Sequence, residues 1–235
     1  MPSPRIIAIG GGALDEPTTG PMVRFVLDQT GKQRPRVLFL PTATGNVPSY
    51  AVNFYAALSR VAEASHLDLF DRRVADLRPT VLEQDAIFVG GGNTANLLAI
   101  WRTHALDVLL RQAWQAGIVL SGVSAGANCW FESSVTDSFG PLAALPAGLG
   151  FLAGSFCPHF DREPLRRPTF RALVAAGELP PGLAADDDAA LVFEGTELVE
   201  VVAARSDAAG YRLSLDAGSG QVKEERLAAR YLRAD

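Results

Sequence analysis

The stretch Gly122-Val123-Ser124-Ala125-Gly126 follows the apolar run Ile118-Val119-Leu120 and opens a segment, residues 125–132, that can form a helix. A serine at such a corner between strand and helix lies in a tight turn, and the flanking glycines leave its hydroxyl accessible. The first N–H groups of the helix have no partner within it, so the N–H of Ala125 can help to hold an oxyanion. The pattern predicts a nucleophile at Ser124, with an ordinary turn between strand and helix as the alternative.

Around this turn, short apolar runs alternate with longer helical patterns. Strands are predicted over residues 5–9, 36–40, 66–70, 86–89 and 118–123, and helices over residues 21–30, 50–64, 95–115 and 125–131. The alternation indicates right-handed crossovers and a parallel sheet covered on both faces. Ligands of such a sheet bind beyond the carboxyl ends of its strands. The loops 10–12, 41–45 and 90–94 and the Ser124 turn are expected to converge there.

Past Ser155 the pattern changes, because frequent prolines keep helices short apart from residues 169–176. Residues 190–193, 197–203 and 211–215 then alternate as strands, which predicts antiparallel hairpins that complete the same sheet. The length of 235 residues and the hydrophobic content of 48% are sufficient for one large α/β domain. We therefore expect a single domain over residues 1–235.

Composition and charge narrow the function classes. The formal net charge is −5 and the sequence has no run of Lys or Arg, which argues against nucleic acid as a partner. The apolar start breaks at Gly10-Gly11-Gly12, so we expect a first strand rather than a signal peptide, and no apolar run reaches the ~18 residues of a membrane span. Cys129 and Cys157 are expected to be buried thiols. A cytoplasmic location follows as the prediction.

A serine nucleophile needs a base, and the sequence contains three histidines. His66 heads a predicted strand at the end opposite the ligand loops, and His104 lies within a predicted helix. His159 follows Ser155-Phe156-Cys157-Pro158, which the proline keeps from being helical, so its imidazole is expected where a strand ends. We predict His159 as the general base, with a histidine that caps a loop as the alternative.

A carboxylate must orient that histidine and stabilise the imidazolium. Asp186-Asp187-Asp188 lies just before the predicted strand at residue 190, and mutual repulsion opposes burial of all three carboxylates. At least one is expected to face a positive partner, for which His159 is the candidate. Asp161 is a weaker rival, and a solvated acidic turn is the alternative.

The two triple-glycine loops, Gly10-Gly11-Gly12 and Gly90-Gly91-Gly92, lack the spaced glycines and the lysine of a nucleotide-binding loop. The second loop would instead let the backbone approach a substrate carbonyl. We predict the N–H of Gly92 as an oxyanion donor opposite Ala125. Thr94 is expected to cap the following helix.

Taken together, these motifs resemble the peptidase E (S51) family of serine peptidases, which includes aspartyl dipeptidases and, more distantly, cyanophycinases. The pairing of a Gly-Gly-Gly-Asn-Thr loop with a Ser-Ala-Gly-Ala turn is the most specific feature. The resemblance implies a three-layer α/β/α fold with a mainly parallel sheet, similar to class I glutamine amidotransferases, and a triad in the order Ser, His, acid. The matching stretches are residues 6–12, 37–43, 89–94, 122–127 and 157–160 and the acidic stretch before residue 190.

By this resemblance Ser124 is the nucleophile and His159 the base. The family's acid, typically a glutamate, falls on Asp187, with Asp186 as the other choice. Dipeptidases of the family favour an N-terminal aspartate, and an arginine downstream of the histidine is expected to hold that carboxylate.

That arginine matches Arg166 best, with Arg167 next, and a planar guanidinium suits bidentate recognition of a carboxylate. The interposed Glu163-Pro164 distinguishes this loop from that of the better-known dipeptidases. Two carboxylates near the turn could meet the free α-ammonium of a substrate. The further candidate contacts with substrate are thus Asn93, Glu132 and Asp137.

The expected activity is that of a cytoplasmic serine exopeptidase that hydrolyses dipeptides or short peptides with aspartate first. No metal or organic cofactor is implied, and the expected partner is a small peptide rather than nucleic acid or membrane, bound by a monomer or homodimer. A glutamine amidotransferase-like hydrolase of another amide is one alternative, although it would require a cysteine at position 124. A non-catalytic small-molecule binding module on the same fold is the other.

Overall fold

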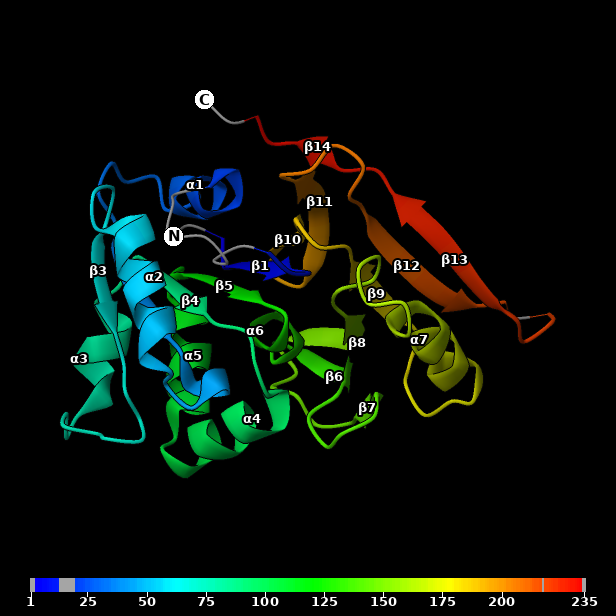
Figure 1. Ribbon diagram of the computed structural model, residues 1–235, viewed down its shortest axis with the longest axis horizontal. Coiled ribbons are helices and arrows are strands. Elements are labelled where there is room, and N and C mark those ends of the chain that lie inside the picture. The colour runs from blue at the N-terminus through cyan, green and yellow to red at the C-terminus, as the bar shows by residue number, and fades with distance from the viewer. Residues whose placement is uncertain (1–2, 13–19, 217, 234–235) are drawn as a thin grey trace.

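The computed structural model describes residues 3–12, 20–216 and 218–233 of the chain (Figure 1). Within these residues eight strands form one mixed sheet. Their order is β14 (Arg230–Tyr231), β11 (Glu197–Ala203), β10 (Ala189–Glu194), β1 (Arg5–Ile9), β5 (Val119–Val123), β4 (Ala86–Val89), β2 (Arg36–Leu40) and β3 (Glu63–His66). Five adjacent strands of this sheet run parallel, in the order β1, β5, β4, β2 and β3. Strand β10 pairs with β1 in the antiparallel sense.

Helices cover both faces of the parallel strands. Successive strand residues point to opposite faces, so Ile6 and Ile7 of β1 belong to two different buried clusters. One face packs against α1 (Pro21–Asp28) and α2 (Pro48–Leu58), and the other against α3 (Leu77–Leu82), α4 (Thr94–Thr103) and α5 (Leu106–Gln115). This arrangement confirms the predicted parallel sheet covered on both faces. Among the helices of the described residues, none has the length and apolar character that crossing a bilayer requires.

A second sheet lies beside the first, on the right of Figure 1. Among the described residues six strands form it, in the order β13 (Val222–Leu227), β12 (Gly210–Leu215), β9 (Gly182–Ala185), β8 (Leu152–Cys157), β6 (Phe131–Thr136) and β7 (Ala143–Leu145). The helix α7 (Arg166–Ala175) packs against it, with Phe170 in one buried cluster with Phe160 and Tyr211. The rings of Phe131 and Phe156 stack at 4.8 Å and join β6 to β8.

The predicted C-terminal hairpins divide between the two sheets. The hairpin of β10 and β11 extends the main sheet as expected. The prediction that residues 211–215 complete the same sheet is wrong, because β12 pairs with β9 and β13 in the second sheet. Alternation of apolar residues shows that a segment is half-buried, but it does not show which partner strand covers its apolar side.

Several element boundaries differ from the prediction, three of them by a change in the course of the chain. The helix predicted over residues 95–115 is broken at Ala105, whose φ of 53° ends α4 and lets α5 begin at residue 106. The strand predicted at residues 66–70 ends at His66, because α2 stops at Leu58 and leaves residues 63–66 to pair with β2. Helix α6 (Ala125–Asn128) is a single turn, since the chain enters β6 at Phe131.

Both cysteines are buried and free, as predicted. Burial raises the pKa of the Cys129 thiol and that of the Cys157 thiol well above the ordinary value. Neither thiol is therefore suited to act as a nucleophile at neutral pH.

Candidate active site

Ser124 lies in a strained turn between β5 and α6. Its φ of 54° and ψ of −112° lie outside the ordinary regions for a residue with a side chain. Two glycines make the turn possible, because a Cβ on Gly122 would overlap the carbonyl of Gly126 and a Cβ on Gly126 would overlap the carbonyl of Val89. The N–H of Ser124 donates to the carbonyl oxygen of Ile9 at 3.0 Å. The serine is thus fixed by its neighbours in the conformation typical of an exposed nucleophile.

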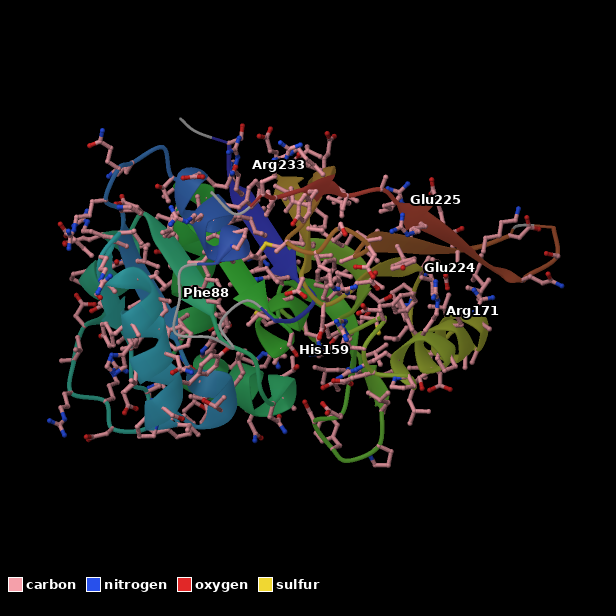
Figure 2. The ribbon with its side chains drawn as sticks, turned by 45° about the horizontal axis from the view of Figure 1, so that its top comes forward. Phe88, His159, Arg171, Glu224, Glu225 and Arg233 are labelled. Carbon is pink, nitrogen blue, oxygen red and sulfur yellow. The ribbon has the colours of Figure 1, made fainter. Side chains whose placement is uncertain are left out.

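His159 reaches Ser124 from the loop after β8. The distance from His159 Nε2 to Ser124 Oγ is 2.8 Å, and that from His159 Nδ1 to Asp187 Oδ1 is 2.6 Å. The side chains of His159 and Asp187 are 20% and 23% exposed, so the pair is partly shielded while the site stays open to a substrate. Figure 2 shows His159 where the two sheets meet. Three side chains from distant segments therefore form one continuous chain of hydrogen bonds.

The neighbouring Asp186 has different partners. Its Oδ2 accepts from the N–H of Ala209 at 2.9 Å and from the hydroxyl of Tyr211 at 3.1 Å. The residue is 2% exposed, and burial raises the pKa of the Asp186 carboxyl. Of the two carboxylates that the sequence left open, the structure brings Asp187 to His159 and uses Asp186 in the packing of β12.

Asp161 and Arg205 hold the loop that carries Asp187. The N–H of Asp187 donates to Asp161 Oδ1 at 2.9 Å, and Arg205 forms an ion pair with the same carboxylate. Nη2 of Arg205 also donates to the carbonyl oxygen of Asp187 at 3.1 Å. Asp161, the weaker rival for the acid, therefore supports the Asp187 loop and is not hydrogen-bonded to the imidazole.

The first triple-glycine loop has a role that the sequence analysis missed. A Cβ on Gly11 would overlap the Asp187 carboxylate and Nδ1 of His159, and a Cβ on Gly12 would crowd the Asp188 carboxylate. The loop after β1 is therefore free of side chains so that His159 and Asp187 can approach each other. The signal in the sequence was three glycines directly after a buried strand and without a nucleotide-binding pattern.

The second triple-glycine loop lies against the Ser124 turn. Of its glycines, Gly91 lies next to Ser124, because an added Cβ on Gly91 would lie 3.5 Å from Ser124 Cβ. Gly92 has a φ of 131° and packs so closely on Ala43 that a Cβ would overlap the Ala43 carbonyl. Ala125 is the first residue of α6. The oxyanion roles of Gly92 and Ala125 stay predictions.

Asn93 caps the helix that follows this loop. Its side chain accepts from the N–H of Asn96 at 2.9 Å and donates to the carbonyl oxygen of Ser138 at 3.0 Å. The prediction that Thr94 caps the helix is wrong, because Thr94 is already the first helical residue and its hydroxyl accepts from Asn128 at 3.3 Å. A contact of Asn93 with substrate stays a prediction.

Arg166 is buried behind the site. Its side chain is 4% exposed, Nε donates to Glu163 Oε2 at 2.6 Å, and Nη1 donates to the carbonyl oxygen of Val135 at 3.2 Å. Nη2 lies 3.8 Å from the carboxylate of Asp137. The other oxygen of Glu163, Oε1, lies 4.0 Å from His159 Nε2. The residue that separates Arg166 from the imidazole is therefore Glu163.

Glu163 is a site residue that the sequence analysis did not single out. Its N–H donates to the carbonyl oxygen of His159 at 3.2 Å, so one turn of chain places the two side chains on the same side. The signal that could have revealed it is a spacing of four residues between His159 and Glu163.

Arg167 and Arg171 point away from the site. Nε of Arg167 donates to Glu224 at 3.1 Å, and its guanidinium lies over the rings of Phe160 and Tyr211. Arg171 Nη1 donates to the same carboxylate at 3.3 Å, and Figure 2 shows Arg171 of α7 close to Glu224 of β13. Recognition of a substrate by Arg167 stays a prediction, and the observed contacts of this side chain are structural.

The two carboxylates predicted to meet an α-ammonium lie apart. Oε2 of Glu132 accepts from the N–H of Gly154 at 2.8 Å and so links β6 to the β8 segment. Asp137 lies beside Arg166 and is mostly exposed. A role in substrate binding stays a prediction for both.

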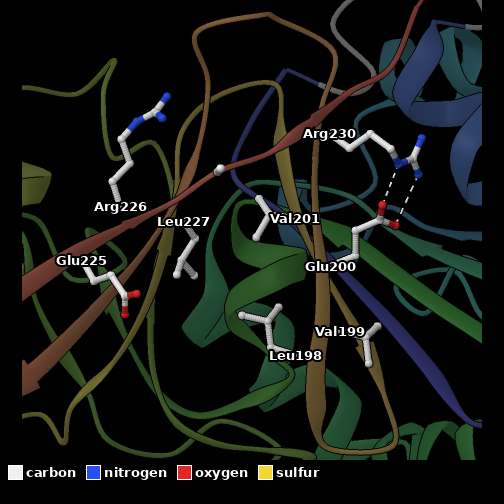
Figure 3. A pocket seen from close by; sticks show the side chains of 9 residues that line it. Leu198, Val199, Glu200, Val201, Glu225, Arg226, Leu227 and Arg230 are labelled. Carbon is white, nitrogen blue, oxygen red and sulfur yellow. Dashed lines mark hydrogen bonds and ion pairs between the residues drawn. The ribbon is translucent and has the colours of Figure 1, made fainter.

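Two recesses differ in their relation to the triad. One of about 460 Å³ lies between β11 and β13 and includes Leu198, Val201 and Leu227 in its wall, but none of the three hydrogen-bonded site residues (Figure 3). Another of about 310 Å³ is lined by the 42–45 turn, Phe70 and α4. That second recess lies next to the glycine loop, because its wall includes Ala43, on which Gly92 packs.

Comparison with known proteins finds a family match and similar chains. The family model of peptidase family S51 matches residues 6–201. The chain is 46% identical over 230 residues to the uncharacterized peptidase YgaJ of Bacillus subtilis, covering 97% of this chain and 99% of that protein. It is 29% identical over 138 residues to peptidase E of Shewanella denitrificans, covering 52% and 58% respectively.

The fold is similar to that in the crystal structure of a peptidase from an acI-B1 Actinobacterium. The TM-score is 0.68 at 20% sequence identity, over 97% of this chain and 95% of that chain. The three-layer α/β/α fold that the resemblance implied is thereby confirmed. Because the family model and a relative over nearly the full length agree, we conclude that this chain belongs to peptidase family S51.

Proposed function

We propose that this chain is a serine exopeptidase that hydrolyses dipeptides or short peptides with Ser124 as nucleophile, His159 as base and Asp187 as acid. Membership in family S51 makes the chain a serine peptidase. The observation that carries the finer proposal is the hydrogen-bonded chain from Ser124 Oγ through the imidazole to Asp187 Oδ1, with distances of 2.8 and 2.6 Å. A serine hydroxyl is a weak nucleophile until a base removes its proton, and this arrangement supplies that base.

The proposed reaction has two halves. His159 Nε2 takes the hydroxyl proton while Ser124 Oγ attacks the scissile carbonyl carbon, and the same nitrogen then gives the proton to the leaving amine. A water molecule then attacks the acyl-enzyme carbonyl while His159 takes its proton. His159 returns that proton to Ser124 Oγ as the Oγ–C bond breaks, and the second product, which carries the new carboxylate, leaves. Throughout, Asp187 accepts a hydrogen bond from the Nδ1–H group, which keeps the proton on Nδ1. Nε2 can therefore act as the base, and the carboxylate stabilises the imidazolium.

The oxyanion would form at the N-terminus of α6. The N–H of Ala125 is available there because the first N–H groups of a helix have no partner within it. We propose a second donor from the glycine loop, for which Gly92 is the predicted residue. Support comes from the contact of that loop with the Ser124 turn at Gly91.

A preference for aspartate as the first residue is a further prediction for this site. Such a preference needs a guanidinium that can accept a new carboxylate. Arg166 already donates to Glu163 at 2.6 Å, and Arg167 and Arg171 already pair with Glu224. The preference stays a prediction, as does a cytoplasmic location.

The alternative of a glutamine amidotransferase-like hydrolase would require a thiol at the nucleophile position. Position 124 is serine, and the nearest cysteine in sequence, Cys129, is buried with its sulfur against the carbonyl of Gly126. A binding module without turnover is the other alternative, and membership in a family of serine peptidases argues against it.

The test is a panel of dipeptides with Asp, Asn, Ala or Leu first, each with a free and with an acetylated amino group. We expect wild type to cleave free dipeptides and Ser124→Ala to lose at least about 10³-fold in kcat. Turnover that persists in Ser124→Ala would reject the nucleophile, and cleavage of acetylated peptides alone would reject the exopeptidase. A rate for Asp-first at least tenfold above that for Asn-first would establish the acidic preference.

A further inference from the structure

Glu163 stands at the site with its two carboxylate oxygens in different surroundings. Oε2 accepts from the buried Arg166, whereas Oε1 faces His159 Nε2 at 4.0 Å. Because Ser124 Oγ lies 2.8 Å from the same ring nitrogen, Glu163 and the serine hydroxyl converge on one atom. The Glu163 side chain is 46% exposed, so solvent and a substrate can reach it.

The charge around Glu163 favours a cation. The guanidinium of Arg166 lies beside two carboxylates, those of Glu163 and Asp137. One positive and two negative groups leave this cluster with a net negative charge. The anchoring of Oε2 by a side chain that is 4% exposed also fixes the direction of Oε1, which reduces the entropy lost when a ligand binds.

A peptide with a free amino terminus carries a cation, its α-ammonium group, near Ser124 when it is bound for cleavage. The α-ammonium is attached to the carbon next to the scissile carbonyl when the first residue is removed, so it lies close to the attacking oxygen by covalent geometry. We propose that Glu163 is the specificity-determining residue that binds the free α-ammonium of the substrate through Oε1 while Arg166 holds Oε2. This inference rests on the proposed exopeptidase function and names the group that makes the enzyme require a free amino terminus.

The test compares two ligands that differ in the amino group alone. 1-Aminoethylboronic acid and ethylboronic acid can both bond to a serine hydroxyl, and only the first carries an ammonium. We expect wild type to bind the amino compound at least tenfold more tightly in calorimetric titrations. Glu163→Gln, which keeps an acceptor for Arg166 and loses the charge, should abolish most of that advantage and leave the affinity for ethylboronic acid unchanged.

A matched control is Glu225→Gln, which removes the same charge from the second sheet, where Glu225 lies 3.8 Å from Arg212. It should retain the tenfold advantage. An advantage that is equally large in wild type and Glu163→Gln would overturn the inference. Equal losses for both boronic acids would also overturn it, because they would mean that Glu163 acts through His159 or through the fold.

Failure of the proposed function gives a different result. If neither boronic acid binds wild type and a fluorophosphonate does not label Ser124, the serine is not a nucleophile and both proposals fall. If Ser124 is labelled and ethylboronic acid binds, the nucleophile stands, and the comparison of the two ligands decides the role of Glu163 alone.

Discussion

At the residue scale, the pair Asp186 and Asp187 shows how surroundings assign a task to a side chain. Asp187 accepts from the imidazole at 2.6 Å, whereas Asp186 accepts from a backbone N–H and from the Tyr211 hydroxyl in a buried position. A carboxylate beside the imidazole selects the tautomer in which Nε2 can take a proton. The same group one residue earlier contributes to packing.

We therefore expect Asp187→Asn to lower kcat by about 10⁴-fold, because an amide donating to Nδ1 selects the wrong tautomer. Asp186→Asn is the matched control and should change kcat by less than about threefold. Both are measured as kcat on the best dipeptide of the panel, with circular dichroism to confirm folding. Similar activity losses in the two variants would show that the acid has been assigned wrongly.

At the element scale, the attachment of α7 to the second sheet keeps the histidine loop in place. Arg167 and Arg171 of α7 both pair with Glu224 of β13, so one carboxylate joins a helix to a strand 53 or more residues away. Burial alone would raise the pKa of Glu224, but the two guanidinium groups outweigh it and hold the pKa of that carboxyl below its ordinary value. The folded state therefore binds the Glu224 proton more weakly than the unfolded chain does.

The sign of the pH dependence follows from this lowered pKa. The contribution of Glu224 is fully present above the ordinary glutamate pKa of ~4.3 and is lost as the pH falls through the lower folded value. We expect Glu224→Gln to lower the free energy of unfolding by about 1 kcal/mol at pH 7. The difference from wild type should shrink below pH ~4.3 in urea titrations.

Glu225→Gln is the control for this experiment too, because its partner Arg212 is exposed and 3.8 Å away. It should change the free energy of unfolding by less than about 0.5 kcal/mol at either pH. If the loss of unfolding free energy in Glu224→Gln stays constant down to pH 3, the lowered pKa of Glu224 does not contribute to stability as proposed.

At the scale of the whole molecule, the site is where two sheets meet. Ser124 follows a strand of the main sheet, and His159 follows a strand of the second sheet. The loop of Asp187 runs between β9 and β10, one strand from each sheet. Arg205, just after β11, ties these parts together through Asp161 and the carbonyl oxygen of Asp187. A shift of one sheet against the other would separate the triad.

We expect Arg205→Ala to lower kcat about tenfold or more with little change in KM, because a small displacement of the acid misplaces the imidazole. Arg205→Lys should restore part of the activity. The measurement is kcat and KM on the same dipeptide, with the melting temperature recorded for each variant. A lower melting temperature with unchanged kcat would assign Arg205 to stability alone.

Much of the parallel core was predictable because it depends on local patterns. β1, β2 and β4 have the predicted boundaries, since a buried parallel strand is a short apolar run that ends at a glycine or proline. The break at Ala105 and the strand at residues 63–66 were missed, because a left-handed residue without glycine and a strand of mixed polarity carry no such signal.

What the sequence alone determined is the local geometry at Ser124, because a strand, a glycine-flanked serine and a helix that follow one another build that turn from adjacent residues. It also narrowed the other two partners to His159 and the aspartates near 187. Tertiary structure decided that Asp187 contacts the imidazole, that Glu163 stands between Arg166 and the site, and that β12 joins the second sheet. These pairings join residues far apart in the chain or depend on which side of a loop faces a neighbour, and only the packing of the two sheets against each other sets them.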